Sequence, residues 1–345
     1  MEYEWIPFSI SFRKNIVKIY QNICYNERKR KRGKTMKKFA MGILLCLISM
    51  FSFAKEYKML IPNGLPTIAL ASMMEETKEI DGASLHYLLP KANDSMMVEM
   101  MKGSPDIAVI PSNLAAQLYQ KQGEYKILGT LTSSSFYILG QNPLSELKEL
   151  KGKKIYAFAK GLTPDIVLKT ILKRNQLEKE VDIQYLSSPI EALQMHLKDK
   201  NSFVFLTEPM ITQAMLKNKE IKILFSMAEE WKKQFPETSG FPQAVLVLKK
   251  ELLGKDEFLK ELEMSLQSSV NFLYSSPRRR EVLAKYGFPF SEEALTQLLK
   301  RAGIQWTGIS SVQQKENFEQ CYKILMQENP KTIGGRLPED SIYAD

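Results

Sequence analysis

Polar residues and glycines directly follow apolar, strand-like runs at four places in the sequence. They are Asn63-Gly64-Leu65-Pro66, Ser112-Asn113, Gly161-Leu162-Thr163 and Thr207-Glu208. In open α/β sheets, ligands bind beyond the carboxyl ends of strands, because the first N–H groups of the next helix have no helical partner and carry partial positive charge. These turns are therefore candidate ligand-binding residues, although the same residue types also cap helices that bind nothing.

Three further features have two readings each. The carboxylate of Glu208 can accept a hydrogen bond from a ligand amine or ring N–H, or stabilise a helix N-terminus with no ligand. Ser133 and Ser134 can hydrogen-bond a solute or form an ordinary polar loop. Trp231 can line the binding site or cover an apolar patch.

A segment of the chain occurs twice, and this repeat locates the candidate residues. Residues 61–70 and 158–168 each contain an apolar strand, a Gly-Leu turn and a helix begun by Pro. Residues 106–113 and 202–209 repeat in the same way. The offsets agree, at 97 residues (64 to 161) and 96 residues (106 to 202). Two similar α/β lobes with a ligand cleft between them are therefore expected.

Alternating strand-like and helix-like segments are typical of a mainly parallel sheet covered by helices. The expected strands are 57–61, 84–89, 107–110, 127–130, 136–139, 154–158, 182–186, 203–206, 221–225 and 244–248. The expected intervening helices are 67–76, 95–102, 113–119, 164–174, 189–198 and 209–216. Four helices with no strand between them should follow, at 256–274, 277–286, 291–302 and 312–327, with Arg278-Arg279-Arg280 as a solvated helix start.

Motifs of catalysis and metal binding do not occur in the sequence. The two histidines, His86 and His196, have no Cys, Asp or second His at ligand spacing. There is also no His-x-x-x-His, Cys-x-x-Cys, P-loop or Gly-x-Ser-x-Gly. No catalysis, cofactor or metal is therefore expected.

The positive charge is concentrated at the start of the chain. Residues 1–54 hold 11 Lys and Arg against 3 Asp and Glu, whereas residues 55–345 hold 37 against 36. Because residues 55–345 are nearly neutral, the clustered basic charge that is typical of nucleic-acid-binding proteins is not expected there. Lys37-Lys38, an apolar run of 15 residues from Phe39 to Phe53, and a small residue at Ala54 are typical of a signal peptide cleaved after Ala54. The run is shorter than the ~20 residues of a membrane span.

The remaining residues of this region refine the prediction of export. Met36 stands where an exported chain would begin, so residues 1–35 are expected to be an upstream extension outside the working protein. Lipid attachment at Cys46 is not expected, because Ile43-Leu44-Leu45 precede it instead of a small residue. Cys321 is the one cysteine after residue 54, which excludes an internal disulfide in the mature chain. A soluble periplasmic or extracellular protein is expected.

Together the export signal and these motifs resemble the solute-binding proteins of ABC importers. The resemblance rests on residues 64–70, 106–113, 161–165 and 207–209, and it extends from Lys55 to Tyr322. It is strongest to the nitrate/sulfonate/taurine branch, which includes receptors for thiamine-pyrimidine precursors. It implies a type II periplasmic-binding fold, in which strands near 136–140 and 241–246 cross between the lobes.

The resemblance also implies a function. A small solute, either an oxyanion, a sulfonate or a pyrimidine-like molecule, would bind between the lobes of a monomer that docks on an ABC permease with its ATPase. The expected organisation is an upstream extension (1–35), a signal peptide (36–54), a first lobe (55–138), a second lobe (139–242), and a return to the first lobe with C-terminal helices (243–345).

Two other hypotheses stay open at this point. The fold also resembles pyrimidine-precursor synthases that use a cleft histidine, and this hypothesis requires His86 or His196 to face the cleft. The ligand-sensing domains of transcription regulators share the fold too, but they need a DNA-binding segment before the lobes, where this sequence has an export signal.

Overall fold

A computed structural model of the chain describes residues 55–90 and 93–344. The predicted upstream extension (1–35) and signal peptide (36–54) lie outside the described residues. Within those residues, no helix combines the length and the apolar character needed to cross a membrane.

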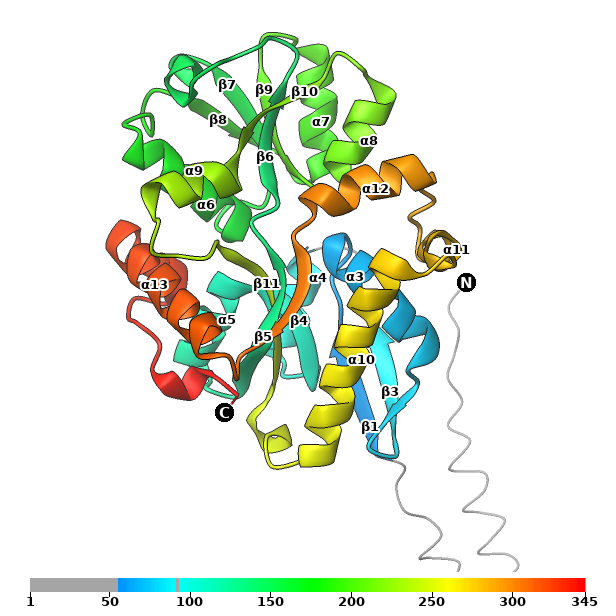
Figure 1. Cartoon of the computed structure of the whole chain (residues 1–345). Coiled ribbons are helices and arrows are strands. Elements are labelled where there is room, and N and C mark those ends of the chain that lie inside the picture. The colour runs from blue at the N-terminus through cyan, green and yellow to red at the C-terminus, as the bar shows by residue number, and fades with distance from the viewer. Residues whose placement is uncertain (1–54, 91–92, 345) are drawn as a thin grey trace, which may run out of the picture. The chain divides into compact units, whose positions relative to one another are not determined.

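The described chain forms two β-sheets (Figure 1). The seven-stranded sheet has the order β12-β5-β11-β4-β1-β3-β2, and the five-stranded sheet has the order β10-β6-β9-β7-β8. The first contains β1 (Glu56–Leu60), β2 (Glu79–Ile80), β3 (Ala83–Leu88), β4 (Ile107–Pro111), β5 (Tyr125–Ser133), β11 (Pro242–Lys249) and β12 (Ile304–Gly308). The second contains β6 (Phe136–Gly140), β7 (Lys154–Ala157), β8 (Asp182–Tyr185), β9 (Phe203–Thr207) and β10 (Lys222–Ser226).

The internal repeat of the sequence is a repeat of topology. The order β5-β11-β4-β1-β3 in the first sheet matches β10-β6-β9-β7-β8 in the second. The predicted fold of two similar α/β lobes is confirmed. The sheets are mixed rather than mainly parallel, because β11 and β6 each arrive from the other sheet and pair antiparallel with both neighbours.

Two short segments carry the chain between the sheets. We call residues 55–133 and 242–344 lobe 1 and residues 136–240 lobe 2. Ser134-Ser135 joins β5 to β6, and Phe241 leads back into β11. These are the two crossings that the resemblance implied; the expected lobe boundary at 138/139 falls inside β6.

Helices cover the faces of both sheets. In lobe 1 they are α3 (Leu65–Glu76), α4 (Asn93–Met101), α5 (Ser112–Lys121), α10 (Asp256–Ser275), α11 (Arg279–Lys285), α12 (Glu292–Arg301) and α13 (Val312–Glu328). In lobe 2 they are α6 (Thr163–Arg174), α7 (Pro189–Lys198), α8 (Met210–Lys217) and α9 (Met227–Gln234). α3 is apolar almost all round, because α10 and α11 cover the side that the sheet leaves free.

The buried apolar side chains fall into three clusters. The first contains residues of both lobes, including Ile110, Phe136, Trp231, Phe241 and Phe318. The second contains lobe 1 residues only, and the third lobe 2 residues only. The two lobes therefore share an apolar core around the crossing segments.

The prediction of four C-terminal helices without an intervening strand is wrong. β12 lies between α12 and α13 and pairs antiparallel with β5 at the edge of the first sheet. Ile304 and Trp306 alternate with Gln305 and Thr307, so a short period-two pattern was present in the sequence and was missed.

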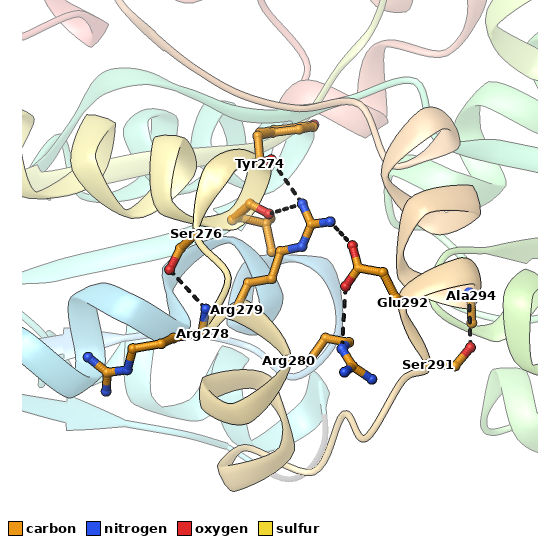
Figure 2. Close-up of polar contacts among 9 residues, drawn as sticks. Tyr274, Ser276, Arg278, Arg279, Arg280, Ser291, Glu292 and Ala294 are labelled. Atoms are coloured by element: carbon orange, nitrogen blue, oxygen red, sulfur yellow. Dashed lines mark hydrogen bonds and ion pairs between the residues drawn. The ribbon is translucent and has the colours of Figure 1, made fainter.

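Arg279 is part of a bridge between helices rather than of a solvated helix start (Figure 2). Its Nη1 donates to the carbonyl oxygen of Tyr274 (2.9 Å) at the end of α10, and its Nη2 contacts the Glu292 carboxylate at the start of α12. Arg280 Nε lies 3.3 Å from the same carboxylate. Arg278 and Arg280 are exposed, whereas the Arg279 side chain is largely buried.

Candidate functional site

The carboxyl edges of the two sheets face a common junction. In lobe 1, Pro111, Ala244 and Thr132 lie in register on β4, β11 and β5, at the end of each strand nearest the crossing segments. In lobe 2, Thr207 pairs with Phe136, which follows the two-residue crossing directly. Because the crossing is so short, the ends of β4 and β9 both lie beside it, where Ser135 Oγ is 3.1 Å from Thr207 Oγ1.

Asn113 of lobe 1 hydrogen-bonds directly to lobe 2. The Thr163 hydroxyl donates to Asn113 Oδ1 (2.9 Å), and Asn113 Nδ2 lies 3.3 Å from the carbonyl oxygen of Gly161. Asn113 and Thr163 are both buried. Two predicted binding turns, 48 to 50 residues apart in sequence, are therefore in contact at the start of α5 and the start of α6.

Ser112 precedes this contact and has an unused hydroxyl. The carbonyl oxygen of Ser112 accepts from the Tyr322 hydroxyl (3.0 Å). Its Oγ is buried and has no hydrogen-bond partner among the described residues. A buried hydroxyl without a partner is costly, so a ligand group that bonds Ser112 would be favoured.

The turn that follows β1 in lobe 1 is more exposed than the contact around Asn113. Asn63 is exposed, and its Oδ1 accepts from the backbone N–H of Gly64 (2.9 Å). Gly64 has φ of 111°, and no atom lies within 4 Å of where its Cβ would be. Leu65 is buried and Pro66 half-buried in the first turn of α3, where no side chain caps the helix and no residue is acidic. The backbone at this turn is accessible to a ligand.

An internal carboxylate supports the equivalent turn in lobe 2. Asp165 accepts from the Gly161 N–H (2.7 Å), from Lys169 Nζ (3.0 Å) and from the Tyr185 hydroxyl (2.5 Å). Burial and the adjacent Asp165 raise the pKa of Tyr185. Gly161 itself is exposed, with φ of 80°, and Leu162 is half-buried. The Gly161–Thr163 turn is thereby held in place from within lobe 2.

Ser133 and Ser134 hold the crossing segments together. The Ser134 Oγ accepts from the backbone N–H of Phe241 (2.7 Å), and the Ser134 N–H donates to the Phe241 carbonyl (3.1 Å). The N–H of Ser133 donates to the Gly303 carbonyl (2.9 Å). These contacts join the chain that leaves lobe 1 to the segment that returns to it and to the loop before β12. The serines therefore have a structural use apart from any solute.

Glu208 is engaged by other side chains. Arg301 Nε donates to Glu208 Oε1 (2.7 Å), and the N–H and hydroxyl of Thr212 donate to its two oxygens, both at 3.0 Å. Burial raises the pKa of Glu208, while Arg301 and Thr212 act in the opposite direction. The geometry therefore brings Asn113, Ser112, Gly161 and Thr163 together, and holds Glu208 in a separate ion pair.

Sequence reasoning missed Arg301 and the role of Asp165. Arg301 is the last residue of α12, in a helix whose pattern of basic residues is ordinary. Asp165 had a local signal, because it lies four residues after Gly161, within reach of the turn. No comparable signal links Arg301 to Glu208, which are 93 residues apart.

The histidines lie away from the junction, and Trp231 is buried against the crossing residue Phe241. His86 is in the middle of β3 near Glu56, and its register partner is Lys58. His196 is buried near the amino end of β9, where its Nδ1 lies 3.2 Å from Ser202 Oγ. Trp231 is buried against Phe241 with ring centroids 4.9 Å apart, and its N–H donates to Thr238. Trp231 thus belongs to the shared apolar core.

A cavity of about 310 Å³ lies elsewhere in lobe 1, between α3, β2 and α10. Ser72, Glu76, Glu79, Glu261 and Ser268 are among its lining residues, and none of the predicted binding residues is. Within residues 55–90 and 93–344, no group of His, Cys, Asp and Glu side chains is arranged to hold a metal ion.

Comparisons with known proteins were made at the levels of sequence and structure. No protein-family model matches the chain, and no curated protein sequence matches it. A crystal structure described as an ABC transporter from Parabacteroides distasonis superposes with a TM-score of 0.69 and 23% identity, covering 84% of this chain and 98% of that one.

Two further solved structures have the same fold. The periplasmic aliphatic sulphonate binding protein SsuA from Escherichia coli has a TM-score of 0.66 and 15% identity, with 82% of this chain and 91% of that one covered. A ligand-binding component of an ABC-type import system from Staphylococcus aureus, with zinc bound, has a TM-score of 0.64 and 14% identity, with 84% and 96% covered. The expected resemblance is confirmed at the level of the fold, which is that of periplasmic binding proteins.

Proposed function

We propose that this protein is an extracytoplasmic receptor that binds a small solute between the strand ends of its two lobes. It would then deliver the solute to an ABC permease driven by an ATPase. The observation that carries the proposal is the junction itself, where the carboxyl edges of both sheets and the starts of α5 and α6 meet. Structural neighbours described as a sulphonate binding protein and as a ligand-binding component of an ABC-type import system support it.

The proposed contacts come from three turns. They are the exposed turn before α3, the start of α5 and the start of α6 (Asn63, Gly64, Leu65, Pro66, Ser112, Asn113, Gly161, Leu162 and Thr163). We propose that Ser133, Ser134 and Glu208 support the site without touching the solute, because their hydrogen bonds go to other residues of the protein.

The chemistry of the turns favours an acceptor-rich solute. Neither α3 nor α5 has an acidic residue in its first turn or a capping side chain, so their N-termini are free to attract negative charge. In lobe 2, the carboxylates of Asp165 and Glu208 already accept hydrogen bonds from backbone N–H groups at the corresponding helix starts. An oxyanion such as a sulfonate, held mainly by lobe 1, is the proposed solute class, with a pyrimidine-like solute as the alternative.

The alternative of a histidine enzyme gains no support from the geometry. It requires a histidine at the junction, whereas His86 lies in mid-strand and His196 at the opposite end of β9. Binding without catalysis, in a monomer exported to the periplasm or the cell exterior, is the function we propose.

Thermal stabilisation by solutes tests the proposal. Chain 55–345 would be screened with taurine, methanesulfonate, MOPS, sulfate, nitrate, hydroxymethylpyrimidine and amino acids, and native mass spectrometry would identify any copurified solute. A true ligand at a hundred times its Kd should stabilise the fold by about 2.7 kcal/mol. A complete absence of stabilisation and of a copurified solute would count against a receptor.

A matched pair of variants locates the site. Asn63→Ala removes an exposed side chain at the proposed contact, and Asn271→Ala removes an exposed asparagine from α10 of the same lobe. Only Asn63→Ala should weaken binding of the solute found in the screen, with little effect on the stability of the free protein. Equal effects of the two variants would place the site elsewhere.

A further inference from the structure

α12 lies at the boundary between the lobes and touches them in two different ways (Figure 1). Its buried residues Leu295, Leu298 and Leu299 belong to the apolar cluster of lobe 1, together with Val282 and Phe288. No residue of lobe 2 belongs to that cluster. The helix also runs directly into β12 of the lobe 1 sheet. Apolar contacts and chain connection therefore fix α12 to lobe 1.

α12 packs beside α8 of lobe 2, and the hydrogen bonds that it makes with that lobe centre on Arg301. Its Nε donates to Glu208 (2.7 Å), its Nη2 donates to the Thr212 hydroxyl (2.8 Å), and its carbonyl oxygen accepts from the Tyr137 hydroxyl (3.3 Å). The Arg301 side chain is 17% exposed and that of Glu208 is fully buried. Polar contacts of this kind can be exchanged for water when two surfaces separate, whereas apolar packing cannot.

The Glu208 carboxylate, if unpaired, would repel an anionic solute at the junction. The carboxylate sits at the end of β9, beside the junction, and burial opposes its ionised form. The Arg301 guanidinium supplies the neighbouring positive charge. Loss of one partner from a buried pair leaves an uncompensated charge, which is much more damaging than loss of both.

We propose that Arg301 is a positioning residue of the solute site, which docks on Glu208 and Thr212 as the lobes come together. Docking cancels the Glu208 charge at the junction and lets the closed site accept an anionic or neutral solute. This inference rests on the proposed function, since it assumes that the lobes part and close around a solute. α12 is expected to move with lobe 1, so that Arg301 and Glu208 become hydrated when the lobes part.

The distance between the lobes tests docking without a solute. Spin labels on cysteines introduced at the exposed positions Gln267 in lobe 1 and Lys219 in lobe 2 would report the distribution of distances. Arg301→Gln should shift the distribution to longer distances at pH 8. Acidification to pH 5 should partly reverse the shift, because protonation of Glu208 removes the unpaired charge; Tyr137, the other titratable group at this contact, stays protonated throughout.

Companion variants separate positioning from a general structural role. The double variant Glu208→Gln with Arg301→Gln should lose the pH dependence and recover the short distance between the lobes. Arg301→Lys, which keeps the positive charge, should keep part of the population at the short distance. Arg278→Gln, at an exposed arginine that bridges no lobes, is the control for loss of charge. If Arg301→Gln matches wild type at both pH values, or if the double variant is no better than the single one, the inference is overturned.

Solute affinity gives a second readout. Using MOPS as the anionic probe, Arg301→Gln should weaken binding about tenfold or more at pH 8, and the double variant should restore it. A wild-type protein that binds no solute in the screen would argue against the proposed function. A wild type that binds MOPS while Arg301→Gln binds it equally well would overturn this inference alone.

Discussion

Acidic residues stand at the starts of α6 and α8 in lobe 2 and at neither of the corresponding helices of lobe 1, α3 and α5. Asp165 accepts from the Gly161 N–H before α6, and Glu208 accepts from the Thr212 N–H in α8. α3 and α5 have no acid in the first turn. The repeated turns thus have similar backbones and different charges, so lobe 1 is the lobe suited to hold an anion.

His196 makes stability depend on pH. Ser202 Oγ donates to the carbonyl oxygen of Asp199, so it accepts from His196 Nδ1–H, which leaves the buried Nε2 unprotonated and without a partner among the described residues. Burial lowers the pKa of His196 below its ordinary value of 6.5. Above pH 6.5 the ring is neutral in both the folded and the unfolded state. Below it the unfolded state binds the proton more readily, so folding loses stability.

Urea denaturation between pH 8 and pH 5 checks this expectation. His196→Gln should flatten the loss of stability below pH 6.5, and His86→Gln, at an exposed histidine, is the matched control for removal of a histidine. Identical slopes in wild type and His196→Gln would show that His196 is not the group responsible.

At the scale of elements, the crossing segments are packed against one another. Ser134 bonds the segment that enters β11, and Ser133 bonds the segment that enters β12. Gly303 has φ of 57°, and a Cβ there would lie 2.0 Å from the Ser133 carbonyl oxygen. Only glycine permits so close an approach of two backbones. The crossing region therefore depends on a residue outside both crossing strands.

Gly303→Ala is expected to destabilise the fold by about 2 kcal/mol or more, because both the backbone conformation and the contact become strained. Gly254→Ala is the matched control. Its Cβ would meet no atom within 4 Å and its φ is not left-handed, so it should be neutral or stabilising by about 0.4–1 kcal/mol. Equal unfolding midpoints for the two variants would contradict this reading of the crossing.

Arg279 ties the end of α10 to the start of α12 (Figure 2). Arg279→Ala should cost about 2 kcal/mol of unfolding free energy, since it removes hydrogen bonds from a charged, mostly buried donor to the α10 carbonyls. Arg278→Ala, at an exposed side chain, should change stability by less than about 0.5 kcal/mol. Chemical denaturation distinguishes the two, and a cost for Arg278→Ala as large as that for Arg279→Ala would refute the bridge.

At the scale of the whole molecule, two lobes of equivalent strand order share an apolar core around their crossings. The same arrangement brings equivalent strand ends to one junction. This arrangement is the basis of our proposal that a solute binds between the lobes rather than within one.

Export is expected to yield a mature chain that begins at Lys55. The predicted cleavage follows Ala54, and the first strand of lobe 1, β1, begins at Glu56. Expression of the full chain in a bacterial host, followed by intact mass measurement and N-terminal sequencing of the extracytoplasmic fraction, checks both the site and the location. A mature protein that retains residues before 55, or that stays in the cytoplasm, would contradict the prediction.

Sequence patterns were sufficient for most of the elements and for the repeat. The α7 bounds, Pro189–Lys198, agree with expectation because Ser188 caps the helix and Pro189 begins it. The position of the candidate turns at strand ends also followed, since the strand, turn and helix signals are local. β12 and α9 were missed although both have local signals. Ile304 and Trp306 alternate with polar residues in β12, and Ser226 caps α9.

The sequence by itself determined that two similar α/β lobes present glycine- and hydroxyl-bearing turns at equivalent strand ends. Those features depend on composition and spacing over about ten residues at a time. Only the tertiary structure decided that Asn113 meets Thr163, that Ser134 holds Phe241, and that Arg301 takes the Glu208 carboxylate. Such pairings join residues 50 to 107 positions apart, and they depend on how whole elements pack, for which a local pattern carries no signal.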